Sequence, residues 1–308
     1  MKITILFALL SCISAFRCMN FYGLETPRLG FVCDWAHPPY HYLSILKQTM
    51  NIDTIRLPFS REYIESGNFS LMDCFIRDCN SLGLSVILDY HRTYASHQGP
   101  SPEEGISLTQ FEDTWALVAA RYKDHGNVIG IGIFNEYQGK DAEYVIKIHN
   151  QVISAIESVV PDKYLYFVGC TNWGGDCGQF RLDKFNIDPE RLYIEVHKYI
   201  FSGASNPTDW DISIPSSVPS SNWFIGEMGW KSTIPREREW AHTFLSYLHK
   251  RNITNVCGWT IAHSGDTDGW WKDDCEVFDW GKAAVLNAFW ETRSRRLRGS
   301  LDTIPLSG

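Results

Sequence analysis

Short apolar runs recur along the chain and are separated by stretches whose apolar residues follow a helical period. Val86-Ile87-Leu88 and the run from Val128 to Phe134 are continuously apolar, which is typical of parallel strands covered on both faces. The pattern predicts eight such strands. They span residues 28–34, 54–58, 84–91, 128–136, 164–171, 192–199, 223–227 and 256–262.

Amphipathic helices are predicted between these strands, because apolar residues there share one face of a helix. Three such faces comprise Phe111, Trp115, Val118 and Tyr122; Tyr144, Ile148, Val152, Ala155 and Val159; and Trp240, Phe244 and Leu248. Eight strand–helix units within about 260 residues match the length of a closed barrel. We therefore predict an α/β fold, a (β/α)8 TIM barrel in a single domain.

An open, doubly wound sheet is the structural alternative. Its phosphate-binding turn would place glycines between a strand and the following helix. Gly130-Ile131-Gly132 lies inside a predicted strand instead, so it does not indicate a dinucleotide site. The formal net charge of −8 also argues against a nucleic-acid partner, because nucleic-acid binders carry clustered positive charge.

The first 15 residues predict an export signal. Lys2 supplies a positive start, residues 3–10 form a short apolar run, and Ser14-Ala15 offers small residues for cleavage. That run is too short to cross a membrane, and no later stretch approaches the roughly 20 apolar residues that a spanning helix needs. A buried N-terminal helix is the alternative. We expect a secreted, extracellular protein whose folded domain covers residues 16–292.

The nine cysteines agree with export, because loss of Cys12 with the signal leaves an even set of eight. Asn68 and Asn252 begin tripeptides that can accept N-linked sugars in a secreted protein. Residues 293–308 are predicted to form a basic tail outside the barrel. Arg293-Ser294-Arg295-Arg296 resembles a convertase site, but a basic end to the last helix is the favoured interpretation.

Two disulfides are hypothesised to clip loops at one rim of the barrel, Cys170–Cys177 and Cys257–Cys275. Cys74 and Cys79 lie five residues apart on a predicted helix and face different directions, so they should not pair with each other. Cys18 and Cys33 are available as their partners. Eight cysteines nevertheless allow 105 connectivities.

Polar and aromatic residues gather at the carboxyl ends of the predicted strands, where a barrel of this kind builds its active site. They are Arg56, Asp89, His91, Asn135, Glu136, Asn172, Trp173, His197, Tyr199, Glu227 and Trp259. Glu136 and Glu227 end the fourth and seventh strands, on opposite sides of an eight-stranded barrel. Glycoside cleavage needs two facing carboxyl groups, one to protonate the leaving oxygen and one to attack or to activate water.

Other chemistries find less support. A metal site at His91 and His197 lacks both a His-Glu-x-x-His helix and a Cys/His cluster with ligand spacing. Asp266 and Asp268 lie in a segment that lacks the remaining positions of a calcium loop. No Gly-x-Ser-x-Gly elbow supports a serine hydrolase. We expect no metal and no cofactor.

Several of these segments together resemble glycoside hydrolase family 5. They are Thr54-Ile55-Arg56-Leu57-Pro58, Asp89-Tyr90-His91, Asn135-Glu136, His197-Lys198-Tyr199, Gly226-Glu227 and Trp259. The near-invariant family positions are complete and occur in the family's order, and the resemblance runs from about residue 28 to 290. One departure is Tyr137, where the family commonly has proline after Asn-Glu.

The resemblance implies a role for each position. Glu136 would be the acid/base and Glu227 the nucleophile of a retaining double displacement. Asn135 would bind the sugar 2-hydroxyl, and Arg56 and Tyr199 would hold Glu227 ionised. The remaining substrate-binding positions would be His91 and His197 beside the cleaved sugar, Trp259 beneath it, and Trp173.

The same segments, with Asn172-Trp173, look most like the endo-β-1,4-glucanase branch, which implies a monomer acting on a β-linked polysaccharide or oligosaccharide. Aromatic platforms are expected among Trp35, Trp173, Trp230, Trp270 and Trp271, about half of which should instead pack in the core. Mannan, β-1,3-glucan and glycolipid hydrolases share the catalytic set. A carbohydrate-binding barrel without activity is the alternative of another class, and transglycosylation is a further one.

Overall fold

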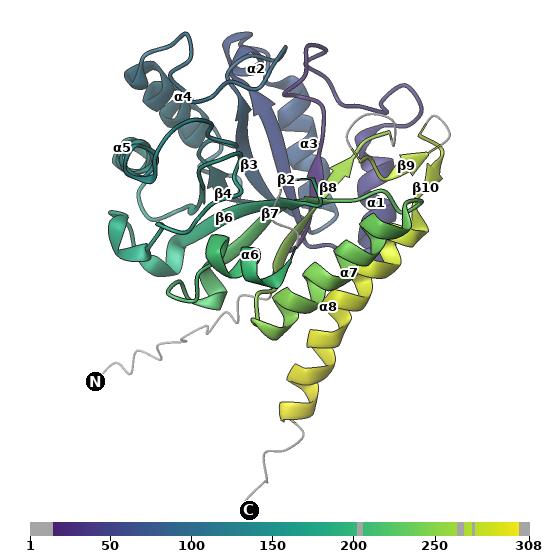
Figure 1. Ribbon diagram of the computed structural model, residues 1–308. Helices are drawn as coiled ribbons and strands as arrows, with labels where there is room; N and C mark the ends of the chain where they lie inside the picture. The colour runs from purple at the N-terminus through teal and green to yellow at the C-terminus, as the bar shows by residue number, and fades with distance from the viewer. Residues whose placement is uncertain (1–14, 202–205, 264–267, 273–274, 302–308) are drawn as a thin grey trace, which may run out of the picture.

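The computed structural model describes residues 15–201, 206–263, 268–272 and 275–301. In this part of the chain, eight strands form a closed barrel surrounded by helices (Figure 1). The strands are β1 (Arg17–Phe21), β2 (Thr54–Ser60), β3 (Ser85–Arg92), β4 (Val128–Gly132), β5 (Leu165–Gly169), β6 (Leu192–Tyr199), β7 (Trp223–Gly229) and β8 (Asn255–Ile261). Neighbouring strands are parallel. The predicted (β/α)8 barrel is confirmed.

The helices that cover the barrel are α1 (Pro39–Met50), α2 (Arg61–Glu65), α3 (Ser70–Ser81), α4 (Leu108–Arg121), α5 (Ala142–Val159), α6 (Pro207–Ser213), α7 (Pro235–Lys250) and α8 (Trp280–Leu301). A hairpin of β9 (Trp271–Lys272) and β10 (Val277–Phe278) precedes α8. Between β5 and β6 the chain makes the short 3-10 turns η1 (Leu182–Lys184) and η2 (Pro189–Arg191), and η3 (Ser220–Asn222) precedes β7. The β5–β6 connection therefore lacks the α-helix that a full strand–helix unit would have.

The first strand was predicted in the wrong place. Residues 28–34 form turns between β1 and α1, whereas β1 begins directly after the predicted export signal. β1 closes the barrel because Cys18 is in register with both Thr54 of β2 and Cys257 of β8. Its pairing with β8 joins opposite ends of the chain, and no local pattern reports such a contact.

Buried apolar side chains form two clusters, one inside the barrel and one around it. Inside the barrel, at its amino-terminal end, a small cluster consists of Phe16, Cys18, Ile87, Phe167, Tyr193, Phe224 and Cys257. A larger core fills the space between the strands and the helices. The amino-terminal end of the barrel interior is filled by apolar residues, and buried polar side chains such as Arg56, Asp89, His91 and Glu227 lie towards its carboxyl end.

Helix packing follows the predicted periodicity with one shift. Phe111, Trp115 and Val118 of α4 are buried, and Ser107 begins this helix with a capping box completed by Gln110. The buried stripe of α5 is Ala142, Val145, Ile148, His149, Val152, Ile153 and Ile156. Tyr144 is only partly buried and Val159 is 47% exposed, so the predicted face was rotated from the real one.

The disulfides only partly match the hypothesis. Cys170–Cys177 forms as predicted. Cys257–Cys275 is wrong, because Cys257 bonds to Cys18 and Cys275 bonds to Cys33. Cys74 and Cys79 are both free, so they do not pair with each other and do not take Cys18 or Cys33 as partners. The long-range pairs, 239 and 242 residues apart in sequence, tie the start of the barrel to its last strand and loop.

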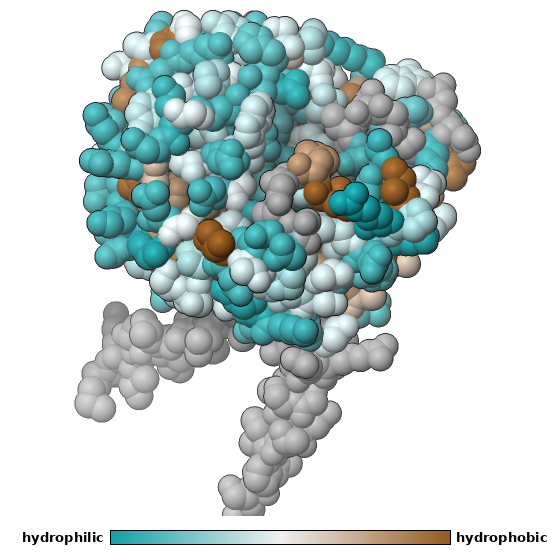
Figure 2. Space-filling view, viewed as in Figure 1, coloured by the Kyte–Doolittle hydropathy of each residue, from teal (hydrophilic) through white to brown (hydrophobic). Residues whose placement is uncertain are grey.

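Among the described residues, no helix is both long and apolar enough to cross a membrane. Almost all of the predicted export signal lies outside the described residues, and so does Asp266. Helix α8 continues through the basic run to Leu301 and extends beyond the barrel (Figure 1). The face seen in Figure 2 is largely hydrophilic, with apolar side chains in small separate patches.

Candidate active site

Arg56 forms the buried centre of a polar cluster at the carboxyl end of the barrel. Its Nη1 donates to Asn20 Oδ1 at 2.9 Å and to Glu227 Oε1 at 3.1 Å. Its Nη2 donates to Asn135 Oδ1 at 2.8 Å and also meets carboxylate oxygens of Asp89 and Glu195. The guanidinium is entirely buried, and these anions raise its pKa although burial opposes the rise, so Arg56 is a fixed cation.

The two predicted catalytic carboxylates face each other across this cluster. One oxygen of Glu136, one oxygen of Glu227 and one nitrogen of His197 all lie within 4.8 Å of one another. Glu227 also accepts a hydrogen bond from the Tyr199 hydroxyl at 2.8 Å. The side chain of Glu136 is 19% exposed, against 5% for Glu227. Glu136 is thus the carboxyl that is more open to solvent.

Opposing influences act on the Glu227 carboxyl. Burial raises its pKa, and the nearby Glu136 acts in the same direction. His197, Arg56 and the Tyr199 hydroxyl act to lower it. The net direction is upward, whereas the sequence led us to expect that Arg56 and Tyr199 would decide the balance. Desolvation at this depth in the barrel is the larger effect.

His197 lies between two carboxylates. Its Nδ1 is 2.9 Å from Glu136 Oε1, and its Nε2 is 3.1 Å from Glu195 Oε1. Burial alone would lower the pKa of this imidazole, but the surrounding carboxylates raise it to about 10. His197 is therefore an imidazolium at neutral pH, with an N–H directed at each carboxylate.

His91 differs from His197 in that its pKa is lowered instead of raised. Burial lowers the pKa of His91 well below its usual value, and neighbouring cations add to the effect, so the ring is neutral. Its Nδ1 is 2.7 Å from Asp89 Oδ2, and its Nε2 is 3.3 Å from Asn135 Nδ2. With Nδ1–H donating to Asp89, Nε2 accepts from Asn135 and fixes the orientation of that amide. The ring also stacks on Trp259, with centroids 5.3 Å apart.

A match to a known family now adds to this geometry. A family model described as Cellulase (glycosyl hydrolase family 5) matches residues 14–265. The chain belongs to glycosyl hydrolase family 5. It is therefore a glycoside hydrolase, as the sequence predicts.

Relatives in the family are endoglucanases. An endoglucanase from Paenibacillus polymyxa is 24% identical over 331 residues, covering 89% of this chain and 82% of that protein. The major extracellular endoglucanase of Xanthomonas campestris is 22% identical over 334 residues, covering 89% of this chain and 67% of that protein.

Solved structures share the fold. The catalytic domain of the major endoglucanase from Xanthomonas campestris superposes with a TM-score of 0.79 at 22% identity, over 90% of this chain and 95% of that one. An endocellulase from Pyrococcus horikoshii in complex with cellotetraose gives a TM-score of 0.76 at 21% identity, over 90% and 92% of the two chains.

The structure brings all the family positions to one end of the barrel. They come from β2 (Arg56), β3 (His91), the segment after β4 (Asn135 and Glu136), β6 (His197 and Tyr199), β7 (Glu227) and β8 (Trp259). Trp173 lies in the loop after β5 and is 52% exposed. Tyr137, the departure from the family pattern, is fully buried and packs on Phe134, so its ring points away from solvent.

The loop that carries Trp173 is held against the site. Cys170–Cys177 closes the loop at its base. The Trp173 N–H donates to the carbonyl of Tyr137 at 2.9 Å, and the His197 N–H donates to the carbonyl of Gly174 at 2.9 Å. Gly174 has a positive φ of 68°, and an added Cβ would lie 3.0 Å from the His197 ring. Glycine thus lets the loop approach His197 closely.

The five tryptophans proposed as sugar platforms fall into two groups by the exposure of their side chains. Trp35 and Trp173 are 51% and 52% exposed. Trp230, Trp270 and Trp271 are buried, and Trp230 and Trp270 pack against each other with centroids 6.0 Å apart. Trp230, Trp270 and Trp271 are therefore core residues, and of these five tryptophans Trp35 and Trp173 are the two whose rings can stack on a sugar at the surface.

Sequence reasoning did not assign a site role to Asn20 or Glu195. Asn20 Nδ2 donates to the carbonyl of Gly226 at 2.9 Å while its Oδ1 accepts from Arg56. The mislocated first strand hid Asn20. Glu195 could have been found, because residues 195, 197 and 199 alternate along one face of β6.

A metal remains a chemical alternative for Glu136, His197 and Glu227, because their oxygens and nitrogen are close together. Metal binding requires a neutral imidazole with a free lone pair. Both nitrogens of His197 face carboxylates, and its pKa of about 10 keeps both protonated at neutral pH. The arrangement thus favours proton transfer over metal binding.

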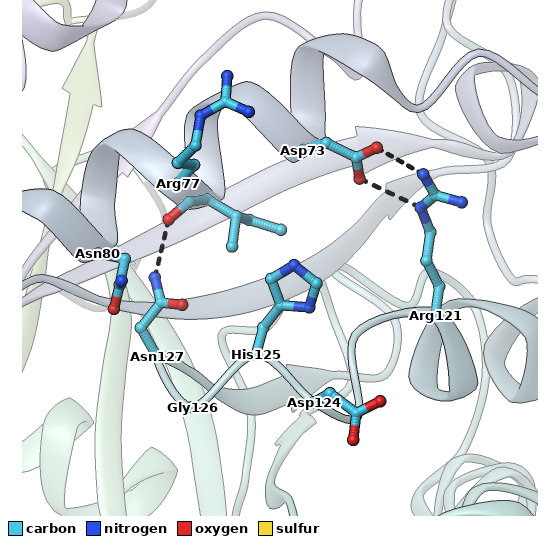
Figure 3. Close-up of a pocket in the computed structure, with 9 residues that line it drawn as sticks. Asp73, Arg77, Asn80, Arg121, Asp124, His125, Gly126 and Asn127 are labelled. Carbon is cyan, nitrogen blue, oxygen red and sulfur yellow. Dashed lines mark hydrogen bonds and ion pairs between the residues drawn. The ribbon is translucent and has the colours of Figure 1, made fainter.

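A separate hollow of about 510 Å³ lies on the outside of the barrel, between α3 and the loop that precedes β4 (Figure 3). Asp73 and Arg121 form an ion pair at its edge, and Asn127 Nδ2 donates to the carbonyl of Ile76 at 2.9 Å. The hollow lies at the amino-terminal end of β3 and β4, away from Glu136 and Glu227, and is not part of the catalytic site.

Proposed function

We propose that this protein is a retaining endo-β-1,4-glucanase in which Glu136 is the acid/base and Glu227 is the nucleophile. The observation that carries the proposal is the approach of the two carboxylates, which have oxygens within 4.8 Å of each other. Retaining glycosidases hold their carboxyl groups about 5–5.5 Å apart, whereas inverting enzymes leave about 6.5–9.5 Å for a water molecule.

The first step forms a covalent glycosyl-enzyme. A Glu227 oxygen bonds to the anomeric carbon as the bond from that carbon to the leaving oxygen breaks, and Glu136 gives its proton to the leaving oxygen. Arg56 and Tyr199 contact opposite oxygens of Glu227, which orients the carboxylate for attack. Asn135, oriented by Arg56 and His91, presents its remaining N–H to the sugar 2-hydroxyl.

The second step returns both carboxyl groups to their starting state. Once Glu227 is an ester it carries no negative charge, and Glu136 acts as a general base that accepts a proton from the attacking water. That water attacks the anomeric carbon, and the ester oxygen of Glu227 leaves as carboxylate. Two inversions at the same carbon retain its configuration.

The proposed substrate is a β-1,4-glucan. The relatives are endoglucanases, and the Pyrococcus horikoshii structure holds cellotetraose. Trp35 and Trp173, both about half exposed, offer ring faces to an extended chain of glucose units. Assays of reducing ends on cellulose-type glucan, β-1,3-glucan and mannan test this substrate class. A preference for mannan or β-1,3-glucan would overturn it.

Separable variants test the two catalytic roles. Glu227→Ala should abolish turnover of every substrate. Glu136→Ala should lose about 10²–10⁴-fold on polysaccharide, because a proton donor is missing. It should still react with a dinitrophenyl cellobioside, whose leaving group needs no proton, and then stall. Added azide should release a β-glycosyl azide from the stalled form.

Covalent labelling provides an independent test. A 2-fluoro cellobioside should attach to Glu227 of the wild type and equally to Glu227 of the surface variant Glu239→Gln, since Glu239 is exposed on α7. A label on another residue, or a first product of inverted configuration, would refute the assignment.

The protein is further proposed to be secreted and monomeric, with residues 1–15 as its signal and residues 293–308 as a tail outside the catalytic domain. Three disulfides and an extracellular relative support secretion. Asn68 and Asn252 are both exposed, which suits them as glycosylation acceptors.

A further inference from the structure

Lys198 is a buried lysine on β6 that connects this strand to the loop after β5. It lies between His197 and Tyr199 in sequence and is 1% exposed. Those two neighbours face the active site, so the alternation of side chains along a strand directs Lys198 to the other face of β6. Its Nζ donates to the carbonyl of Gly175 at 2.6 Å. Gly175 belongs to the loop of residues 170–178 that carries Trp173, called here the Trp173 loop.

Burial of this ammonium group opposes its charge. Burial lowers the pKa of Lys198 to about 8, although Asp176 of the Trp173 loop and Asp209 of α6 act to raise it. Lys198 therefore keeps its charge at neutral pH, and its hydrogen bond to the loop carbonyl is charge-assisted. An apolar side chain would fill the same space without the loss of hydration. The contact with the Trp173 loop is what the lysine provides.

The backbone of the Trp173 loop has a conformation that depends on outside contacts. Asn172, Trp173 and Gly174 have positive φ angles of 52°, 58° and 68°. A left-handed backbone is unusual for a residue with a bulky side chain, and it persists where the surrounding structure holds it. The two residues after Trp173 are glycines, which contribute little stiffness of their own. The direction of the Trp173 ring thus depends on what holds the loop.

Strand β6 holds two successive carbonyls of this loop. The His197 N–H donates to the carbonyl of Gly174 at 2.9 Å, and Lys198 Nζ donates to the next carbonyl along the chain. The second of these bonds is made by a side chain, so a substitution can remove it while the backbone of β6 stays in place. It acts two residues beyond Trp173.

We propose that Lys198 is a positioning residue that fixes the Trp173 loop, so that the ring of Trp173 is in place to stack on the substrate before the substrate binds. The inference rests on the proposed function, in which Trp173 is a sugar platform. Lys198 acts through the loop and does not touch the sugar. A ring that is already ordered loses less conformational entropy on binding, so the effect falls on affinity for the substrate.

The test is a double-mutant cycle on KM for a long cello-oligosaccharide. Lys198→Met keeps a long apolar side chain and removes the donor. It should raise KM about three- to tenfold and leave kcat unchanged, because the lost interaction is made equally in the ground state and the transition state. Adding Lys198→Met to Trp173→Ala should raise KM no further, because there is no longer a ring to position.

Lys163→Met is the matched control. Lys163 Nζ also donates to a loop carbonyl, that of His125 at 2.9 Å, but at the amino-terminal end of the barrel. The control should leave KM unchanged. Additive effects of Lys198→Met and Trp173→Ala, or an unchanged KM in Lys198→Met, would overturn the proposal. An unchanged KM in Trp173→Ala would overturn both the platform and this proposal, whereas the 2-fluoro label decides the retaining mechanism separately.

Fluorine NMR of protein labelled with 5-fluorotryptophan gives a second measurement that does not depend on catalysis. The Trp173 signal is identified by its absence from Trp173→Phe. Wild type should give one sharp Trp173 line that shifts when a cello-oligosaccharide is added, and Lys198→Met should give a broadened or divided line. An unaltered line in Lys198→Met would contradict a positioning role. Several Trp173 lines in the free wild type would overturn the proposal even if the variant fails to fold.

Discussion

A buried carboxyl in the loop between β1 and α1 should make the stability of this protein fall as pH rises. Glu25 is fully buried, and its Oε2 accepts a hydrogen bond from the Gly23 N–H at 2.8 Å. Its Oε1 has no hydrogen-bond partner among the described residues. Burial raises the pKa of Glu25 from 4.5 to about 8, although the Gly23 N–H and Arg92 act to lower it. The folded protein therefore keeps Glu25 protonated at neutral pH.

The magnitude follows from linkage between proton binding and folding. Above pH 4.5 the unfolded chain has released this proton, whereas the folded chain holds it until about pH 8. The stability contributed by the protonated carboxyl is thus fully present below the unfolded pKa and is lost as pH rises through the folded pKa. Each pH unit costs about 1.4 kcal/mol, so Glu25 should remove about 3–4 kcal/mol of unfolding free energy between pH 5 and 8.

The perturbation is Glu25→Gln, which keeps the shape and a carbonyl acceptor but cannot ionise. Urea unfolding with intact disulfides should be measured at pH 5, 6, 7 and 8 for wild type, Glu25→Gln and the surface control Glu239→Gln. The free-energy difference between Glu25→Gln and wild type should change by about 3–4 kcal/mol across this range, in favour of the variant at pH 8. The control should keep a constant difference. Parallel curves for Glu25→Gln and wild type would refute the reasoning, because Glu25 would then be ionised in the folded state.

Two further predictions concern the loops around the site. Trp173→Ala should raise KM for long cello-oligosaccharides about tenfold, because the half-exposed ring no longer contacts a sugar. The control Trp280→Ala, which removes another exposed ring, should leave KM unchanged. Equal increases of KM in both variants would exclude a sugar platform at Trp173. Removing the Cys33–Cys275 disulfide by serine substitution should cost about 4 kcal/mol of unfolding free energy, because with Cys18–Cys257 intact this disulfide closes a loop of about 35 residues. Removing Cys170–Cys177, which closes a much shorter loop, should cost about 2 kcal/mol. Calorimetry that finds the short loop to be the costlier loss would contradict the chain-entropy argument.

Local pattern was enough to determine the barrel and the positions of its polar strand ends. The continuous apolar runs of β3 and β4 indicated strands buried on both faces, and the family positions at the strand ends indicated glycoside chemistry. These features are readable because a parallel strand buries successive residues within a single short segment. The facing of Glu136 and Glu227 follows from their places on the fourth and seventh strands of a closed barrel.

Only the tertiary structure decided the contacts that join distant segments. β1 pairs with β8, and Cys18 bonds to Cys257 across 239 residues, so neither could be read from neighbouring positions. Burial of Trp230 and exposure of Trp173 depend on what packs over each ring, which composition does not report.

The electrostatics of the site also belong to the tertiary structure. The charge of His197 depends on carboxylates from the segment after β4, from β6 and from β7 that meet around one ring, and the proton on Glu25 depends on the depth at which its loop is buried. Sequence determines which groups can ionise. The fold determines how much water each group loses and which charges it meets, and these two quantities decide the protonation states that catalysis uses.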